Sequence, residues 1–212
     1  MRFFFRNRTS YAFGAFPSLP TSLGVLGLAL TLVFSNIAFC TPASVASSSA
    51  EATPPSPLQV KAAFIFNFSV FIEWPENSFS STTDPITVCV LGDEPMADTL
   101  DATLKGRSAK GRPFAVKSSK WPQDLEGCKL VFIGLASTKA PEKTMADFAD
   151  TRALVVADIP GAAEHGAVIN FFQEGDRIRF EVNLSAARKG NFSISSRMLQ
   201  LARIVGQEGG GK

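Results

Sequence analysis

The chain has 212 residues, of which 45% are hydrophobic and 19% charged, and its formal net charge is +2. This length suits one domain with tails, and the apolar fraction is too high for a disordered chain. A charge of +2 argues against nucleic-acid binding, which needs a clear basic excess. A single histidine excludes a multi-histidine metal centre, and two cysteines in the folded part exclude a four-thiolate zinc site. We therefore expect no metal and no other cofactor.

Residues 1–46 have the organisation of an export signal. Three arginines and no acidic residue precede an apolar run at 23–34, and small residues fill 41–50. As a helix the apolar run spans about 18 Å, short of the roughly 30 Å of a bilayer core. We predict a signal peptide that is cleaved after Ser44-Val45-Ala46, and hence an exported protein that does not insert into the membrane after cleavage.

Two alternatives for this segment stay open. The chain could keep it as an uncleaved anchor, or Ala38-Phe39-Cys40 could serve as a lipoprotein site, against which the bulky Phe39 counts. Cleavage after residue 46 removes three of the 21 basic side chains and none of the 19 acidic ones, which leaves a net charge of −1. The basic balance therefore belongs to the signal and not to the folded domain.

The remaining chain divides into a linker at 47–57 that we expect to be disordered, a domain at 58–206 and a flexible tail at 207–212. Within the domain, hydrophobic periodicity predicts helices that alternate with short apolar strands. In chain order the expected elements are a helix at 58–73, a strand at 86–91, a helix at 94–104, strands at 113–118 and 129–133, a helix at 140–150, a strand at 153–157, a hairpin of 167–172 with 177–182, and a helix from 195 to 205.

This alternation predicts an α/β fold, a Rossmann-like layered sheet that is mostly parallel, with helices on both faces. The C-terminal hairpin would add an antiparallel edge. Open sheets of this kind bind ligands at the carboxyl ends of their strands. Asp93, Ser137 and Asp158 lie in the corresponding loops and are candidate ligand-binding residues. Asp93 also precedes a helix, where an acid is explained by the helix dipole alone.

The hairpin carries Arg177 and Arg179 on one side of its second strand, together with Glu181. A cross-strand polar ladder explains these residues, and contact with an anion or an acidic partner is the sharper alternative. The two arginines are therefore also candidate ligand-binding residues. His165 is the only imidazole, it lies in a loop without a nucleophile motif, and we expect no catalytic residue in this chain.

The first helix is apolar on two sides. One side is expected to form the core stripe and carries Val60, Phe64, Asn67, Phe68 and Phe71. The opposite side carries Phe66 and Val70, which are either buried between layers or offered to a partner. With Trp74, just beyond the helix, these two are the candidate partner-binding residues. The last helix is expected to bury Met198, Leu201, Ala202 and Val205.

Cys89, inside the first strand, and Cys128, before the third, remain after removal of the signal. Neighbouring parallel strands would bring them within bridging distance, and an oxidising compartment favours a disulfide. Two buried free thiols are the alternative.

Four segments together carry a family resemblance. They are residues 60–68 with Trp74-Pro75, the strand and turn at 88–93, the segment 179–184, and the closing segment 194–205. Over about 58–205 the sequence resembles the YfiR family of small exported proteins. The resemblance implies a non-enzymatic periplasmic regulator that binds the periplasmic region of an inner-membrane diguanylate cyclase and inhibits it, which lowers cyclic-di-GMP output and biofilm formation.

The same resemblance matches Cys89 and Cys128 to a family cysteine pair and implies a homodimer. A second pair found in some members is missing here, which favours a structural disulfide over redox sensing. The alternative function is a periplasmic sensor domain that binds a small molecule with the strand-end loops. An unrecognised hydrolase working through His165 is the third hypothesis.

Overall fold

The computed structural model describes residues 54–134 and 141–206. The predicted signal peptide, the candidate Ser137 and the predicted tail lie outside the described residues. The strands of the main sheet are β2 (Ile86–Leu91), β3 (Ser108–Ala109), β4 (Arg112–Ser119), β5 (Leu130–Gly134), β6 (Leu154–Asp158), β7 (Ile169–Glu174), β8 (Arg177–Asn183) and β10 (Arg203–Val205). A separate two-stranded ribbon pairs β1 (Ile72–Glu73) with β9 (Ser193–Ile194).

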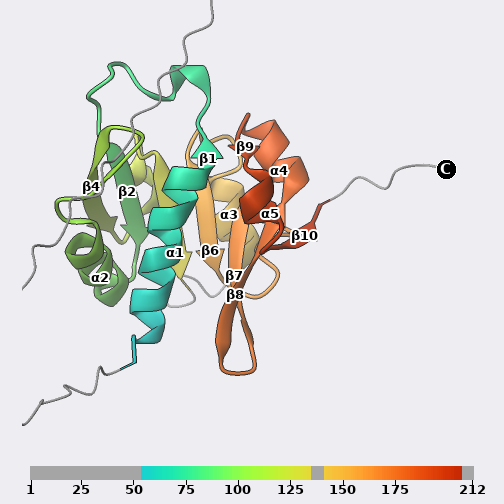
Figure 1. Cartoon of the computed structure of the whole chain (residues 1–212). Helices are drawn as coiled ribbons and strands as arrows, with labels where there is room; N and C mark the ends of the chain where they lie inside the picture. The colour runs from blue at the N-terminus through green and yellow to red at the C-terminus, as the bar shows by residue number, and fades with distance from the viewer. Residues whose placement is uncertain (1–53, 135–140, 207–212) are drawn as a thin grey trace, which may run out of the picture. The chain divides into compact units, whose positions relative to one another are not determined.

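The helices of the described residues are α1 (Pro57–Phe71), α2 (Glu94–Leu104), α3 (Pro141–Asp147), α4 (Leu184–Lys189) and α5 (Ser196–Leu199), with 3-10 turns η1 (Glu76–Ser78) and η2 (Pro122–Leu125). The main sheet runs in the order β10-β8-β7-β6-β5-β2-β4-β3 (Figure 1). The strands from β4 to β7 pair in parallel, and β8 pairs antiparallel with β7 and in parallel with β10. The predicted α/β class with a mostly parallel sheet is confirmed.

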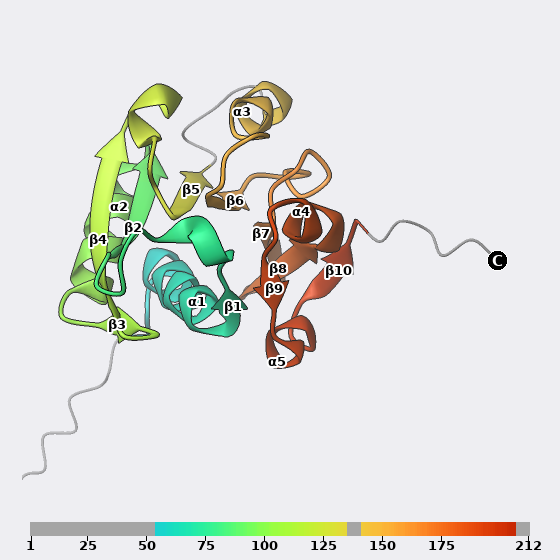
Figure 2. The same ribbon diagram turned by 90° about the horizontal axis from the view of Figure 1, so that it is seen from above.

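Alternate side chains of the central strands belong to two separate cores, one on each face of the sheet. In β2, Val88 and Val90 join the core formed with α1 and α2, whereas Cys89 and Leu91 join the core under α3. Figure 2 shows α1 and α3 on opposite sides of β5 and β6. Burial on both faces explains why these strands read as continuous apolar runs rather than as alternating patterns.

A disulfide joins Cys89 of β2 to Cys128, which lies at the entry to β5, with the two Cα atoms 6.0 Å apart. The strands β2 and β5 are neighbours, with Cys89 opposite Val131. The sheet therefore brings the two cysteines together as expected, and the free-thiol alternative is wrong for this structure.

Helix α1 begins with a complete capping box. Ser56 accepts a hydrogen bond from the Gln59 backbone N–H at 3.3 Å, and its own N–H donates to Gln59 Oε1 at 2.8 Å. The buried positions of the helix are Ala62, Ile65, Phe68 and Ser69, and Asn67 is exposed. Of the expected stripe, Phe68 is buried and Phe64 and Phe71 pack partly buried against the same core, whereas Asn67 is exposed and the prediction is wrong there.

The reason for this difference is that α1 has neighbours on more than one side. It packs on the sheet, against α2 on one flank and against the hairpin strands and α5 on the other. A helix that is apolar around most of its circumference fits such a position, and its sequence periodicity cannot identify one core face.

The predicted elements at 86–91 and 94–104 coincide with β2 and α2, and the other central strands agree within a few residues. The predicted helix at 195–205 is wrong beyond its first turn. Only α5 is helical there, Leu201 is 65% exposed, and Arg203–Val205 form β10. Ile204 pairs with Val182 of β8. Pairing with the unpaired edge of β8 therefore decides the conformation of this segment, although its apolar spacing is helical.

The hairpin is formed by β7 and β8, which confirms the predicted antiparallel element. It is not the edge of the sheet as expected, because β10 lies outside β8. Helix α4, which the sequence reading missed, starts at the capping residue Asn183, whose side chain accepts from the Ala186 N–H at 2.9 Å. Every helix in the described part of the chain is too short or too polar to cross a membrane.

Candidate functional site

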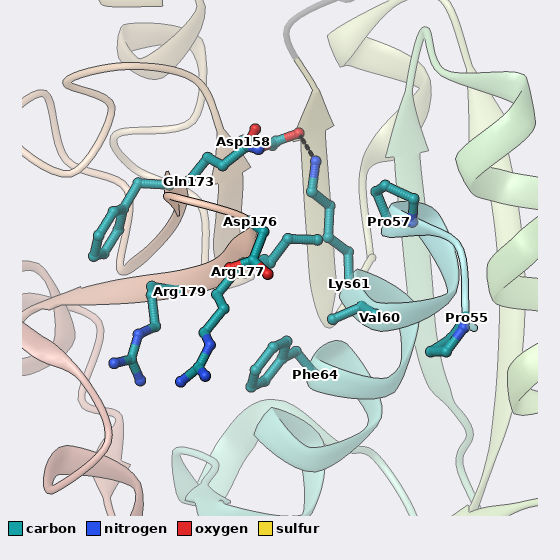
Figure 3. Close-up of a pocket in the computed structure, with 12 residues that line it drawn as sticks. Pro55, Pro57, Val60, Lys61, Phe64, Asp158, Gln173, Asp176, Arg177 and Arg179 are labelled. Atoms are coloured by element: carbon teal, nitrogen blue, oxygen red, sulfur yellow. Dashed lines mark hydrogen bonds and ion pairs between the residues drawn. The ribbon is translucent and has the colours of Figure 1, made fainter.

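A cavity of about 460 Å³ lies where the first turns of α1 meet the β7–β8 hairpin, at the carboxyl end of β6. We call it the hairpin cavity. Three of the five predicted ligand-binding residues line it: Asp158, Arg177 and Arg179 (Figure 3). Val60, Phe64, Phe172 and Ile178 supply apolar walls. An apolar wall with a few convergent charged groups is the usual composition of a small-ligand site.

The inner end of the hairpin cavity is closed by an ion pair between Lys61 of α1 and Asp158, the last residue of β6. Both side chains are mostly buried, at 16% and 27% exposure. The pair ties the first turns of the helix to the carboxyl edge of the sheet. The sequence analysis did not identify Lys61 as a site residue. Lys61 is the only charged residue of α1, and a single charge in an otherwise apolar helix is the sequence signal that could have identified it.

The outer end of the cavity carries the two arginines of β8. Figure 3 shows both guanidinium groups on the same side of the hairpin, near the ring of Phe64. Arg179 donates to Glu174 Oε2 at 3.1 Å, and this pair is solvent-exposed. Arg177 has no ion-pair partner among the described residues. The acidic Asp176 also lines the cavity, next to Arg177, so the charged side chains at this end are of both signs.

The fourth candidate, Asp93, lies away from this cavity. Its side chain accepts from the Met96 N–H at 3.1 Å and caps α2, so the helix-cap reading accounts for it. Asp93 also faces β5, since a Cβ atom at Gly134 would come within 2.7 Å of its Oδ2 atom. The fifth candidate, Ser137, cannot be placed because it lies outside the described residues.

Glu181 takes part in a buried polar network rather than in a ladder with the two arginines. Asn170 donates to Glu181 Oε1 at 3.0 Å, and Arg203 of β10 donates to Glu181 Oε2 through Nε at 3.0 Å. The Ile159 N–H donates to Asn170 Oδ1 at 3.2 Å. The network joins the end of β6 to β7, β8 and β10, and the sequence reading missed it because Arg203 was placed on a helix.

The three candidate partner-binding residues pack against different neighbours. Phe66 packs against Phe114 of β4 with ring centroids 5.8 Å apart, and Arg107 lies over its ring at 5.1 Å. Val70 is half-buried against the same core. Trp74 lies beyond α1, in edge-to-face contact with Phe192 at 5.9 Å. The partner-binding role of all three stays a prediction.

A second and larger hollow of about 1170 Å³ lies at the opposite edge of the sheet, where β6 and β7 begin. We call it the amino-edge groove. It is lined by the connection 73–78 after α1, by 148–153 before β6, by 164–168 before β7, and by parts of 183–193. Trp74 and His165 both contribute to its wall.

His165 lies in an exposed loop, with Nε2 3.7 Å from Glu142 Oε1 and its side chain 40% exposed. The loop position of His165 agrees with the sequence analysis. Among the described residues, no group of three or more His, Cys, Asp or Glu side chains is arranged to hold a metal ion.

The fold has a counterpart among solved structures, a conserved domain protein from Vibrio cholerae O1 biovar El Tor. The match has a TM-score of 0.51 at 10% sequence identity and covers 70% of this chain and 60% of that chain. This chain thus spans about three fifths of the length of that protein, and the likeness shows the fold alone. No curated protein matches the sequence significantly.

The sequence profile of the YfiR/HmsC-like family matches residues 58–203. The matched range runs from the first turn of α1 to the start of β10, and so includes both cysteines and, apart from Pro55 and Pro57, the residues that line the two cavities. The chain belongs to the YfiR/HmsC-like family.

Proposed function

We propose that this protein is a periplasmic regulator that binds the periplasmic region of an inner-membrane diguanylate cyclase and inhibits it. The family is one of regulatory, non-catalytic periplasmic proteins that act on such a cyclase. The observation that carries the proposal is the family match over residues 58–203, which covers nearly all of the folded domain.

Two measurements test this proposal. Deletion of the gene in a strain that expresses the cyclase should raise cellular cyclic-di-GMP and biofilm formation. The purified protein should also bind the purified periplasmic region of that cyclase in isothermal titration calorimetry. Unchanged cyclic-di-GMP together with silent calorimetry would refute the regulator.

Export and assembly belong to the same proposal. We propose that residues 1–46 are removed during export, since the family is periplasmic and the segment has the sequence of a signal peptide. The mass of the protein isolated from the periplasm distinguishes this cleavage from retention and from lipidation at Cys40. A homodimer is expected from the family, and sedimentation equilibrium would detect it.

The hairpin cavity supports a second candidate function, a sensor domain that binds a small molecule. Three predicted residues converge on it from β6 and β8, the two strands that flank β7 in the sheet, and its aromatic wall lies beside the two arginines, of which Arg177 has no ion-pair partner among the described residues. An anionic group on an apolar body fits this combination.

A matched pair of variants tests the sensor. Thermal-shift screening of small carboxylates and phosphate esters should yield a ligand whose binding is weakened about tenfold or more by Arg177→Ala, because a charge-assisted hydrogen bond is lost. Arg188→Ala, on the exposed end of α4, is the control. A screen without any hit, or a hit that Arg177→Ala leaves unchanged, would rule this site out.

A further inference from the structure

The exposed side of helix α1 carries no charged side chain. It consists of exposed and half-buried residues, which are Gln59, Ala63, Phe66, Asn67 and Val70. We call these five residues the outer face of α1. The only charged residue of the helix, Lys61, lies on the opposite side and pairs there with Asp158 of the sheet. A helix that covers a sheet normally presents charged side chains to solvent, so this outer face is unusual.

Helix α2 provides a comparison within the same molecule. It packs into the same core as α1, and its exposed residues include Glu94, Asp98 and Asp101. Figure 1 shows α1 in front of the sheet, between α2 and α5. These neighbours pack against the flanks of α1 and leave its outer face exposed. A helix without charge around its circumference is typical of a buried position, which indicates that the outer face is covered in an assembly.

The spacing of the outer face indicates that another helix covers it. Its central row is formed by Gln59, Ala63, Phe66 and Val70, which follow one another at intervals of four, three and four residues. These are the intervals of the seam residues in packed helix pairs. Ala63 lies within this row, and its small side chain allows a second helix axis to approach closely.

The chemistry of the outer face favours a copy of itself as the covering helix. Two identical surfaces that meet about a two-fold axis must tolerate each other, and a face without charge brings no like charges together. Asn67 is exposed beside the central row, and its amide both donates and accepts hydrogen bonds. Two copies of this amide can therefore satisfy each other across the axis, as a buried asparagine pair does between packed helices.

We propose that the outer face of α1 binds the same face of a second copy of this chain, so that two α1 helices pack together about a two-fold axis. The inference deepens the homodimer of the proposed function by assigning its contact surface, and it does not depend on inhibition of a cyclase. It assigns Phe66 and Val70, two of the predicted partner-binding residues, to contact between copies, and it gives Trp74 no role. The seam is short beside the roughly 20–30 residues a side of stable interfaces, so the dimer should dissociate on dilution.

The first test places a charge on the seam. Sedimentation velocity of the protein isolated from the periplasm, over a range of concentrations, should show a monomer–dimer equilibrium. Ala63→Glu should raise the dimer dissociation constant about tenfold or more, because two carboxylates then meet in a desolvated interface. Ala102→Glu makes the same substitution at an exposed position of α2 and should leave the constant unchanged. Both positions are exposed, so both variants should keep the wild-type urea midpoint.

The second test adds a charge with almost no change of shape. Asn67→Asp replaces the amide by a carboxylate, so the two copies should repel each other at neutral pH and the dimer dissociation constant should rise. Added salt screens this repulsion and should restore part of the affinity of the variant. The wild-type dimer should respond little to salt, because its seam carries no charge.

Three results would overturn the inference, and they can be told apart. A wild-type protein that stays monomeric at every concentration would refute the homodimer together with its surface. A dimer that Ala63→Glu and Asn67→Asp leave intact would show that the copies meet elsewhere. A monomeric wild type whose calorimetric binding to the cyclase region is lost in Ala63→Glu would make the cyclase the occupant of this face. The regulatory function is tested by that calorimetry on the wild type and can stand or fail separately.

Discussion

At the scale of single residues, the ion pair between Lys61 and Asp158 joins helix α1 to the carboxyl end of β6. Lys61 is the only charged residue of α1, and its partner Asp158 lies 97 positions further along the chain, so no local pattern in the sequence identifies the pair. Asp158, Arg177 and Arg179 were identified from their places at strand ends and on one strand face, and the fold brings them into one cavity. Position along an element is readable from the sequence, whereas the partner of a long side chain depends on tertiary packing.

Glu181 should be important for stability. Glu181→Ala removes the acceptor of the buried Asn170 amide and of Arg203, and an unsatisfied buried donor costs about 1–3 kcal/mol of unfolding free energy. Glu174→Ala breaks only the exposed pair with Arg179 and should cost less than about 1 kcal/mol. Urea unfolding measures both variants, and equal losses would contradict the network.

The carboxyl group of Asp84 should make the unfolding free energy of the protein depend on pH in the acid range. A hydrogen bond from the Ser81 hydroxyl and the backbone N–H groups of Ser80 and Ser81 lower the pKa of Asp84 below its ordinary value of 3.8, and Arg112 adds to the effect. A lowered folded-state pKa stabilises the protein above the unfolded-state pKa, and this stabilisation is lost as the pH falls through the folded-state pKa.

A comparison of the wild type with Asp84→Asn tests whether stability changes with pH in this direction. The wild type should be the more stable protein at neutral pH, and its advantage should shrink as the pH falls below about 4. Chemical unfolding at several pH values measures the difference. An advantage that stays constant down to about pH 2 would show that the ionised carboxylate does not matter.

At the scale of elements, β2 and α2 were predicted with their observed bounds because their signals are local. The strand is a continuous apolar run, and α2 starts at the capping Asp93. The segment 195–205 was misassigned for the opposite reason. Its apolar spacing is helical, but the edge of β8 offers backbone partners to Ile204 and its neighbours, and a long-range partner of this kind has no local signal.

The capping box stabilises the first turn of α1, and its loss should lower the unfolding free energy measurably. Ser56→Ala removes the acceptor for the Gln59 N–H and should lower the unfolding free energy by about 0.5–2 kcal/mol. Ser108→Ala, an exposed serine in β3, is a matched control with an expected change within about 0.5 kcal/mol. Thermal or urea unfolding distinguishes the two, and an effect of Ser56→Ala as small as that of the control would contradict the cap.

At the scale of the whole described domain, the disulfide should be the strongest single cross-link. It closes a sequence separation of 39 residues between β2 and the start of β5. In the chain-entropy treatment a loop of this size stabilises by up to about 4 kcal/mol, through restriction of the unfolded chain.

Replacement of both cysteines by alanine tests this contribution. Cys89→Ala with Cys128→Ala should lower the unfolding free energy by up to about 4 kcal/mol, and wild-type protein unfolded in reductant should approach the variant. Both cysteines are buried, so reductant should act through the unfolded state and not on the native surface. A variant as stable as the oxidised wild type would show that packing of β2 on β5 suffices without the bond.

The sequence by itself determined the α/β class, the central strands, the cysteine pair and the family, because each of these depends on local periodicity, on residue type or on segment order. Only the tertiary structure decided that α1 is covered on more than one side, that β10 and not the hairpin forms the edge beside β8, and that Asp158, Arg177 and Arg179 line one cavity. These features depend on contacts between residues far apart in the chain, and a chain pattern read one element at a time carries no information about such contacts.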